Sequence, residues 1–157
     1  RVYIDSDHAG ESLTRRSRTG FTVYLNKAPI YWMSKKQTSC ETSTFGSEFC
    51  AMKQGTEYAR GLCYKLRMLG IPCSEPTFVF GDNQSVLANT TVPASQLKKK
   101  SNSICYHFIR EAVAMKECLT THVPTLRNFA NLLTKCLSGK KRRDLVRGVL
   151  YNIYDYE

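Results

Sequence analysis

The first part of the chain alternates apolar and polar positions, as strands with one buried face do. Apolar residues fall on every second position of residues 2–4 and again of residues 21–25. The Asn-Lys pair at 26–27 predicts a turn into a third strand, over residues 30–35. We therefore expect an opening of three antiparallel strands.

From residue 49 the apolar positions change to helical spacing. They recur every three or four residues up to residue 69, and Gly70 and Pro72 then end the pattern. A connector rich in Ser and Thr precedes this stretch and offers Ser43, Thr44 and Ser47 as helix caps. We expect one long amphipathic helix.

Residues 77–80 form a short continuous apolar run between Pro76 and Gly81, which is typical of a central strand covered on both faces. We expect this strand to lie parallel to the first. The rest of the pattern predicts a short helix from Asn83, a basic loop through Lys100, a helix over 106–116, a strand over 119–123, a helix over 129–137 and a last helix over about 142–151.

The composition suits one soluble domain. The chain has 157 residues, 42% of them apolar, and no stretch approaches the roughly 20 apolar residues of a membrane span. We expect no membrane partner. Since there is no initiator Met and the first residues already read as a strand, we also expect the chain to be part of a longer protein.

The formal net charge is +10 and comes from clusters of Lys and Arg. These clusters lie at residues 15–18, 35–36, 98–100 and 140–143. Such a balance favours a polyanionic partner, and the alternative is a solvated surface that only keeps the protein soluble.

The seven cysteines are an odd number, and they are scattered with no CxxC pair. Neither a disulfide framework nor a zinc site follows. We interpret most of them as small buried hydrophobic residues in a protein of a reducing, intracellular compartment.

Three acidic residues stand where predicted elements end or begin: Asp5 in the first strand, Glu48 at the start of the long helix, and Asp82 just after the fourth strand. Ligands of open α/β sheets gather at the carboxyl ends of the strands, and clustered carboxylates there hold hard cations such as Mg²⁺. Two ions about 4 Å apart can stabilise an in-line phosphoryl displacement. Each acid also has a structural alternative: a strand-end turn for Asp5, complementing a helix N-terminus for Glu48, and a helix cap for Asp82 with Asn83.

Seven blocks of this sequence, in order, resemble the ribonuclease H domains of copia-type (Pseudoviridae) LTR retrotransposon polyproteins. They are YIDSDHAG (3–10), SRTGFTVYL (17–25), APIYWMSKKQ (28–37), STFGSEF (43–49), FGDNQSV (80–86), ICYHFIREAV (104–113) and HVPTLRNFANLLTK (122–135). The resemblance implies a ribonuclease H-like α/β fold, in which three antiparallel strands and then parallel strands form a mixed five-stranded sheet flanked by helices. It implies such a domain over residues 1–138, and we read residues 139–157 as a basic helical extension.

The resemblance also implies an activity: metal-dependent hydrolysis of the RNA strand of RNA/DNA hybrids during reverse transcription. Asp5, Glu48 and Asp82 match the first three metal carboxylates, while Asp7 matches a non-catalytic acid. Two Mg²⁺ ions, for which Mn²⁺ can substitute, are implied as cofactors. The implied partners are the hybrid and the reverse transcriptase domain of the same polyprotein, and the implied location is a cytoplasmic virus-like particle or the nucleus.

Two positions depart from the family pattern. Asn131 stands where most relatives have the fourth metal-site Asp, and Ser101 stands where close relatives have a His after the loop lysines. Asn131 can offer an amide oxygen but no charge, and we expect it to face the three carboxylates as the fourth catalytic and metal-site residue. This leaves an alternative function, a catalytically weakened or dead module that still binds hybrid.

Hybrid contacts are expected to be driven by shape rather than by bases. We expect Lys35, Lys36 and the loop lysines Lys98, Lys99 and Lys100 to hold phosphates. We expect Asn83 and Gln84 to touch the RNA strand near the site, and we expect Ser101 to bind nucleic acid as well.

Two other families share parts of the pattern. Asp5 and Asp7 after a strand also resemble the nucleophile and the general acid/base of haloacid-dehalogenase-like phosphatases, but the antiparallel opening argues against their doubly wound sheet. A retroviral-type integrase would place its Glu third, on a late helix, whereas Glu48 comes second here.

Overall fold

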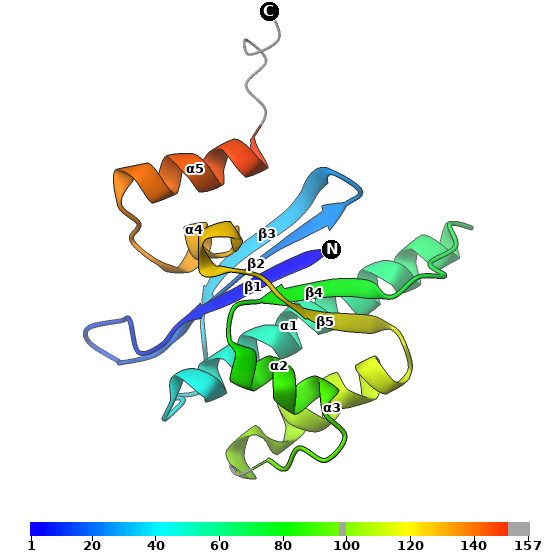
Figure 1. The fold of residues 1–157 in the computed structure, drawn as a ribbon, viewed down its shortest axis with the longest axis horizontal. Coiled ribbons are helices and arrows are strands. Elements are labelled where there is room, and N and C mark those ends of the chain that lie inside the picture. Colours follow the sequence, from blue (N-terminus) through cyan, green and yellow to red (C-terminus); the bar gives the residue numbers. More distant parts are fainter. Residues whose placement is uncertain (98–99, 151–157) are drawn as a thin grey trace, which may run out of the picture.

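The computed structural model describes residues 1–97 and 100–150, and in this part five strands form one sheet with helices on both faces (Figure 1). The strands are β1 (Val2–Asp7), β2 (Arg18–Leu25), β3 (Ala28–Lys36), β4 (Thr77–Gly81) and β5 (Cys118–His122). The helices are α1 (Thr44–Met68), α2 (Gln84–Thr91), α3 (Ser103–Ala114), α4 (Asn131–Thr134) and α5 (Gly139–Val149), with 3-10 turns η1 (Lys100–Asn102) and η2 (Thr125–Arg127).

The strand order across the sheet is β3-β2-β1-β4-β5. β1 pairs antiparallel with β2, and β2 antiparallel with β3. β1 and β4 are parallel, as are β4 and β5. The expected mixed sheet, with three antiparallel strands followed by parallel ones, is therefore confirmed.

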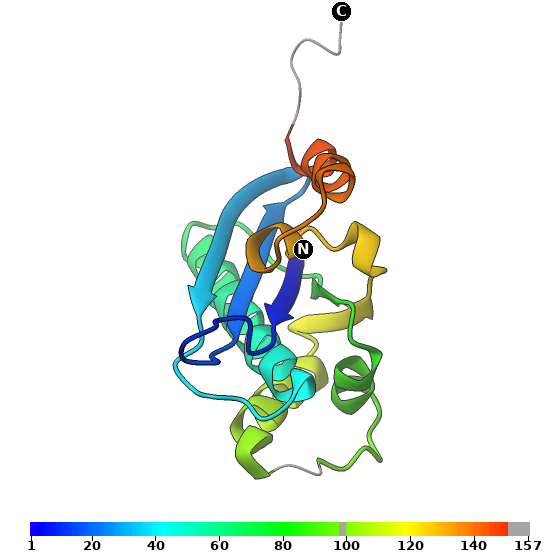
Figure 2. The same ribbon diagram turned by 90° about the vertical axis from the view of Figure 1, so that its left-hand side faces the viewer.

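The two faces of the sheet carry different helices (Figures 1 and 2). On one face α1 crosses the sheet, where Val2 and Ile4 of β1 join Phe49 and Met52 of α1 in the core. On the other face lie α4 and α5, and there Tyr3 packs against Phe129 with ring centroids 4.8 Å apart. Because neighbouring side chains of a strand point to opposite faces, β1 contributes to both layers.

The long helix begins earlier than its apolar spacing predicts. The Ser43 hydroxyl accepts a hydrogen bond from the Gly46 N–H at 3.2 Å and caps the helix, so that α1 starts at Thr44. It ends at Met68, just before Gly70, whose φ of 78° is a left-handed conformation that glycine adopts without strain.

The predicted helix over 129–137 is wrong in length: α4 is a single turn, Asn131–Thr134. The Asn128 side chain accepts a hydrogen bond from the Ala130 N–H at its start, and Lys135 has extended backbone angles (φ −123°, ψ 145°) at its end. The last helix begins at Gly139 rather than near residue 142, and residue 151 of its predicted end lies outside the described residues. The division of the chain at residue 138 stays a prediction.

All seven cysteines lie in the described residues and are unpaired. Cys118 is buried, Cys40 and Cys136 are exposed, and the other four are half-buried. The sequence predicts that most of the cysteines are buried. This prediction is wrong, because Cys118 alone of the seven is buried. Among the described residues, none of the helices combines the length and apolar character needed to cross a membrane.

Candidate active site

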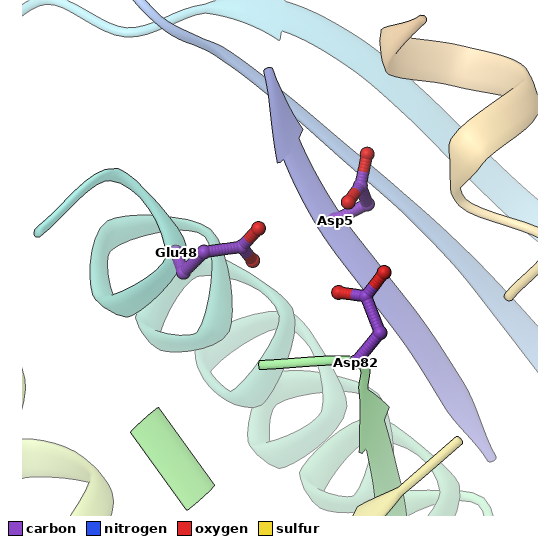
Figure 3. Close-up of side chains that lie close together, drawn as sticks. All are labelled: Asp5, Glu48 and Asp82. Carbon is purple, nitrogen blue, oxygen red and sulfur yellow. The ribbon is translucent and has the colours of Figure 1, made fainter. Parts of the chain in front are cut away.

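The carboxylates of Asp5, Glu48 and Asp82 come together near the carboxyl ends of the neighbouring strands β1 and β4 (Figure 3). Each offers a carboxylate oxygen, and these atoms all lie within 4.8 Å of one another. The register explains part of this convergence: Tyr3 lies beside Phe80 in the parallel β1/β4 pair, so Asp5 and Asp82 follow at the same end. Glu48 reaches the same point from α1.

The structural alternatives for these acids do not account for their positions. The first turn of α1 holds no acidic residue, so Glu48 lies beyond the turn where it would complement the helix N-terminus. Asn83, rather than Asp82, caps α2 by accepting from the N–H groups of Ser85 and Val86. Asp5 lies inside β1 and is fully buried.

Burial and mutual repulsion disfavour ionisation of this cluster. Glu48 is 5% exposed, and its removal from water, followed by the charges of Asp5 and Asp82, raises its pKa to about 8. Burial also raises the pKa of Asp5, although hydrogen bonds from Lys135 and Thr134 act in the opposite direction. A bound cation would relieve both effects.

The donor set fits a hard divalent cation. It consists of carboxylate oxygens only, the ligands that Mg²⁺ and Mn²⁺ accept, and two oxygens on opposite sides of a Mg²⁺ ion lie about 4 Å apart. The 4.8 Å spread of the three ligand atoms is close to that span. Asp5, Glu48 and Asp82 are therefore the residues that could hold a metal.

Two residues at this site were missed by sequence reasoning, Thr134 and Lys135. The Thr134 hydroxyl donates a hydrogen bond to Asp5 Oδ2, and Lys135 Nζ lies 2.8 Å from Asp5 Oδ1. Both belong to the block FANLLTK, in which Lys135 follows Asn131 by one helical turn. That spacing was the available signal.

Asn131 is 2% exposed and does not point into solvent. Its amide nitrogen donates to the backbone carbonyls of Thr125 (2.8 Å) and Asn128 (3.1 Å). Its Oδ1 accepts from Lys135 Nζ at 3.0 Å, so Asn131 reaches the carboxylates through Lys135. Its assignment as a metal ligand stays a prediction.

The basic residues expected to hold phosphates differ in their exposure and in their ion pairs. Lys35 is exposed, whereas Lys36 forms an ion pair with Glu11. Lys100 is exposed in η1, while Lys98 and Lys99 lie outside the described residues.

Three further residues were expected at the hybrid. Ser101 is exposed and donates to Asn102 Oδ1 at 2.8 Å. Asn83 uses its side-chain oxygen to cap α2, and Gln84, the first residue of that helix, is exposed. Both adjoin Asp82, and their contact with RNA stays a prediction.

Solved structures of ribonucleases H match this fold. Ribonuclease H1 from the archaeon Halobacterium salinarum superposes with a TM-score of 0.62 over 84% of this chain and 91% of that one, at 17% identity. LC11 ribonuclease H1, solved in complex with an RNA/DNA hybrid, gives a TM-score of 0.62 over 84% and 91%, at 15% identity. The fold is therefore that of ribonuclease H.

Sequence comparison gives the closer relationship. The retrovirus-related Pol polyprotein of transposon RE2 from Arabidopsis thaliana is 33% identical over 137 residues, 87% of this chain. This chain spans only 9% of that relative's length, and no protein-family model matches it. The chain belongs to the family of copia-type retrotransposon Pol polyproteins, and its own fold is that of ribonuclease H.

Proposed function

We propose that this chain is a ribonuclease H that hydrolyses the RNA strand of RNA/DNA hybrids. The convergence of Asp5, Glu48 and Asp82 within 4.8 Å carries this proposal, because clustered carboxylates at the edge of this fold suit metal-assisted phosphoryl chemistry. The similar fold of a ribonuclease H1 in complex with a hybrid supports the choice of substrate.

The proposed cofactor is Mg²⁺, with Mn²⁺ able to substitute, held by the three carboxylates. When bound, a divalent cation polarises the phosphoryl group and stabilises the attacking and leaving oxygens. The resemblance implies two such ions, and the position of Lys135 bears on that number.

The chain's own residues organise the site before substrate arrives. Thr134 and Lys135 engage the two oxygens of Asp5, and the Ser6 backbone acts to lower the pKa of Glu48. Since these donors come from the folded backbone and from a packed helical turn, the carboxylates need little reorganisation to bind a cation or a phosphate.

Hybrid binding is assigned to the basic surface. The net charge of +10 favours a polyanion, and exposed Lys35 and Lys100 are candidates for phosphate contact together with Lys98 and Lys99. Asn83, Gln84 and Ser101 are candidates for the polar contacts that recognise the RNA strand.

A second candidate function is a module that binds hybrid but cuts it slowly or not at all. One observation favours it: Asn131 is neutral, and its side-chain oxygen accepts a hydrogen bond from Lys135. Both candidates predict hybrid binding, so cleavage separates them.

The test is cleavage of a labelled hybrid with Mg²⁺ and then with Mn²⁺, by the wild-type chain and by Asp82→Asn. We expect wild type to cut the RNA strand and the variant to lose at least about 100-fold in rate, because a lost metal ligand costs several kcal/mol of transition-state stabilisation. Asp82 is partly exposed, so the substitution preserves the fold. An Asp82→Asn chain as active as wild type would move the assignment to the binding module.

Asn131→Asp completes the same assay. The added carboxylate would draw Lys135 away from Asp5 and place charge at the site rather than on the binding surface. We expect the rate to rise about tenfold with nearly unchanged hybrid affinity, and Asp82→Asn to abolish the gain in the double variant. An unaltered rate would also favour the binding module.

We further propose that the chain acts joined to the reverse transcriptase of its polyprotein. The Pol polyprotein relatives, of which it spans 9%, support this context. An intracellular location, in a cytoplasmic virus-like particle or the nucleus, is proposed with it.

A further inference from the structure

Lys135 occupies an unusual place for a lysine, between two side-chain oxygens at the carboxylate cluster. Its Nζ lies 2.8 Å from Asp5 Oδ1 and 3.0 Å from Asn131 Oδ1. The Asp5 side chain in this ion pair is fully buried, while that of Lys135 is 35% exposed. An ion pair with one buried partner is far more costly to break than a surface pair.

The surrounding turn holds Lys135 there. Both amide hydrogens of Asn131 are used by the carbonyls of Thr125 and Asn128, so its Oδ1 faces the lysine. The Lys135 N–H also donates to the Asn131 carbonyl at 3.2 Å. The Thr134 hydroxyl donates to the other oxygen of Asp5. Both contacts to this carboxylate therefore come from α4 and the residue that follows it.

Lys135 also changes the net charge of the carboxylate cluster. When ionised, Asp5, Glu48 and Asp82 carry three negative charges. The ammonium of Lys135 reduces this to a net of minus two, which one divalent cation balances. Two divalent cations would be balanced by four carboxylates, and here the fourth position is the neutral Asn131.

We propose that the ammonium of Lys135 is a built-in cation that takes the place of one of the two divalent ions, so that this site binds a single divalent cation. The inference rests on the proposed function, in that it concerns the same site and its metal. Lys135 is then a positioning residue: it holds Asp5 in place and sets how much negative charge remains for a metal.

The decisive experiment counts bound Mn²⁺ by equilibrium dialysis of the whole chain, with Asp82→Asn giving the background of ions bound elsewhere. We expect one ion above background for wild type and for Lys135→Arg, which keeps the charge. We expect two for the double variant Asn131→Asp with Lys135→Met, where four carboxylates face no lysine. Lys65→Met removes an exposed lysine of α1 and should leave the count at one.

Melting temperature gives a second measurement that needs neither substrate nor turnover. In EDTA, Lys135→Met should melt more than about 5 °C below wild type, because buried Asp5 loses its cation, and Mn²⁺ should restore most of the difference. Lys65→Met should melt like wild type.

Two Mn²⁺ ions in wild type, one in the double variant, or equal melting of Lys135→Met and wild type in EDTA would each overturn the inference. These results are separable from the proposed function. A chain that binds one Mn²⁺ but leaves hybrid intact would retain the inference and remove the ribonuclease activity. A chain that cleaves hybrid with two bound ions would do the reverse.

Discussion

At the scale of single residues, ionisation of Glu48 carries an electrostatic cost in the folded protein. The side chain is 5% exposed and lies beside two other carboxylates, and its pKa rises to about 8, first through burial and then through Asp5 and Asp82. Such carboxylates mark functional sites because the fold alone gains nothing from them. The cost appears when no cation is bound.

This cost predicts a pH dependence of stability. In the unfolded chain Glu48 loses its proton near its ordinary pKa of 4.5, but in the folded chain only near 8, so the folded state binds more protons between these values. In EDTA the free energy of unfolding should therefore fall as the pH rises from about 4.5 to 8, by an amount on the order of 4 kcal/mol. Urea denaturation at several pH values measures it.

The matched variant is Glu48→Gln, which is nearly isosteric and does not titrate. It should lose most of this pH dependence, and Mg²⁺ should reduce it in wild type by stabilising the ionised form. Parallel pH curves for wild type and Glu48→Gln would contradict the assignment of the cost to Glu48.

At the scale of elements, the site depends on how closely two helices approach the sheet. A Cβ on Gly55 of α1 would lie 2.7 Å from Ile4 Cγ2, and one on Gly20 of β2 would lie 2.6 Å from Thr134 Cγ2. Glycine at these positions lets α1 and α4 pack against opposite faces of the sheet. This close packing brings Glu48 and Lys135 to Asp5.

Two glycines of α1 test this reasoning in one helix. Gly55→Ala should destabilise the protein, because overpacking costs about 1–3 kcal/mol and exceeds the gain in helix propensity. Gly61→Ala meets nothing within 4 Å and should stabilise it by up to about 1 kcal/mol. Urea denaturation of both variants measures the difference. Equal stabilisation by the two substitutions would show that α1 does not need its close approach.

At the scale of the whole molecule, the charge of +10 is distributed over several segments rather than placed at the carboxylate cluster, which is acidic. Under the proposed function, the basic surface would hold phosphates and the carboxylate cluster would carry the metal-assisted chemistry. Affinity and turnover should then respond to different residues.

Replacing Lys98, Lys99 and Lys100 together by Ala tests the binding surface. Hybrid affinity should fall by a similar factor for unrelated sequences, and the slope of log affinity against log salt should decrease by up to about 3, since each phosphate contact contributes about 0.9. Binding measured at several salt concentrations with two unrelated hybrids gives both quantities. Loss confined to one sequence would point to base recognition instead.

The sequence by itself determined most of the elements and which parts of the sheet are antiparallel and parallel. Alternation over residues 21–25 and helical spacing over residues 49–69 arise from local burial, so they can be read without knowing the partner surfaces. The family blocks also placed Asp5, Glu48 and Asp82 in order. Their convergence could be expected because parallel strands end at one edge of the sheet.

Only the tertiary structure decided what surrounds those carboxylates. The Asn128 side chain donates to the Ile4 carbonyl at 2.7 Å and so anchors the turn against β1. The length of α4 depends on this contact, which joins residues far apart in the sequence. The contact between Lys135 and Asp5 follows from that docking. No periodic pattern encodes a pairing of residues 130 positions apart, because it depends on the packing of a turn against a glycine of β2.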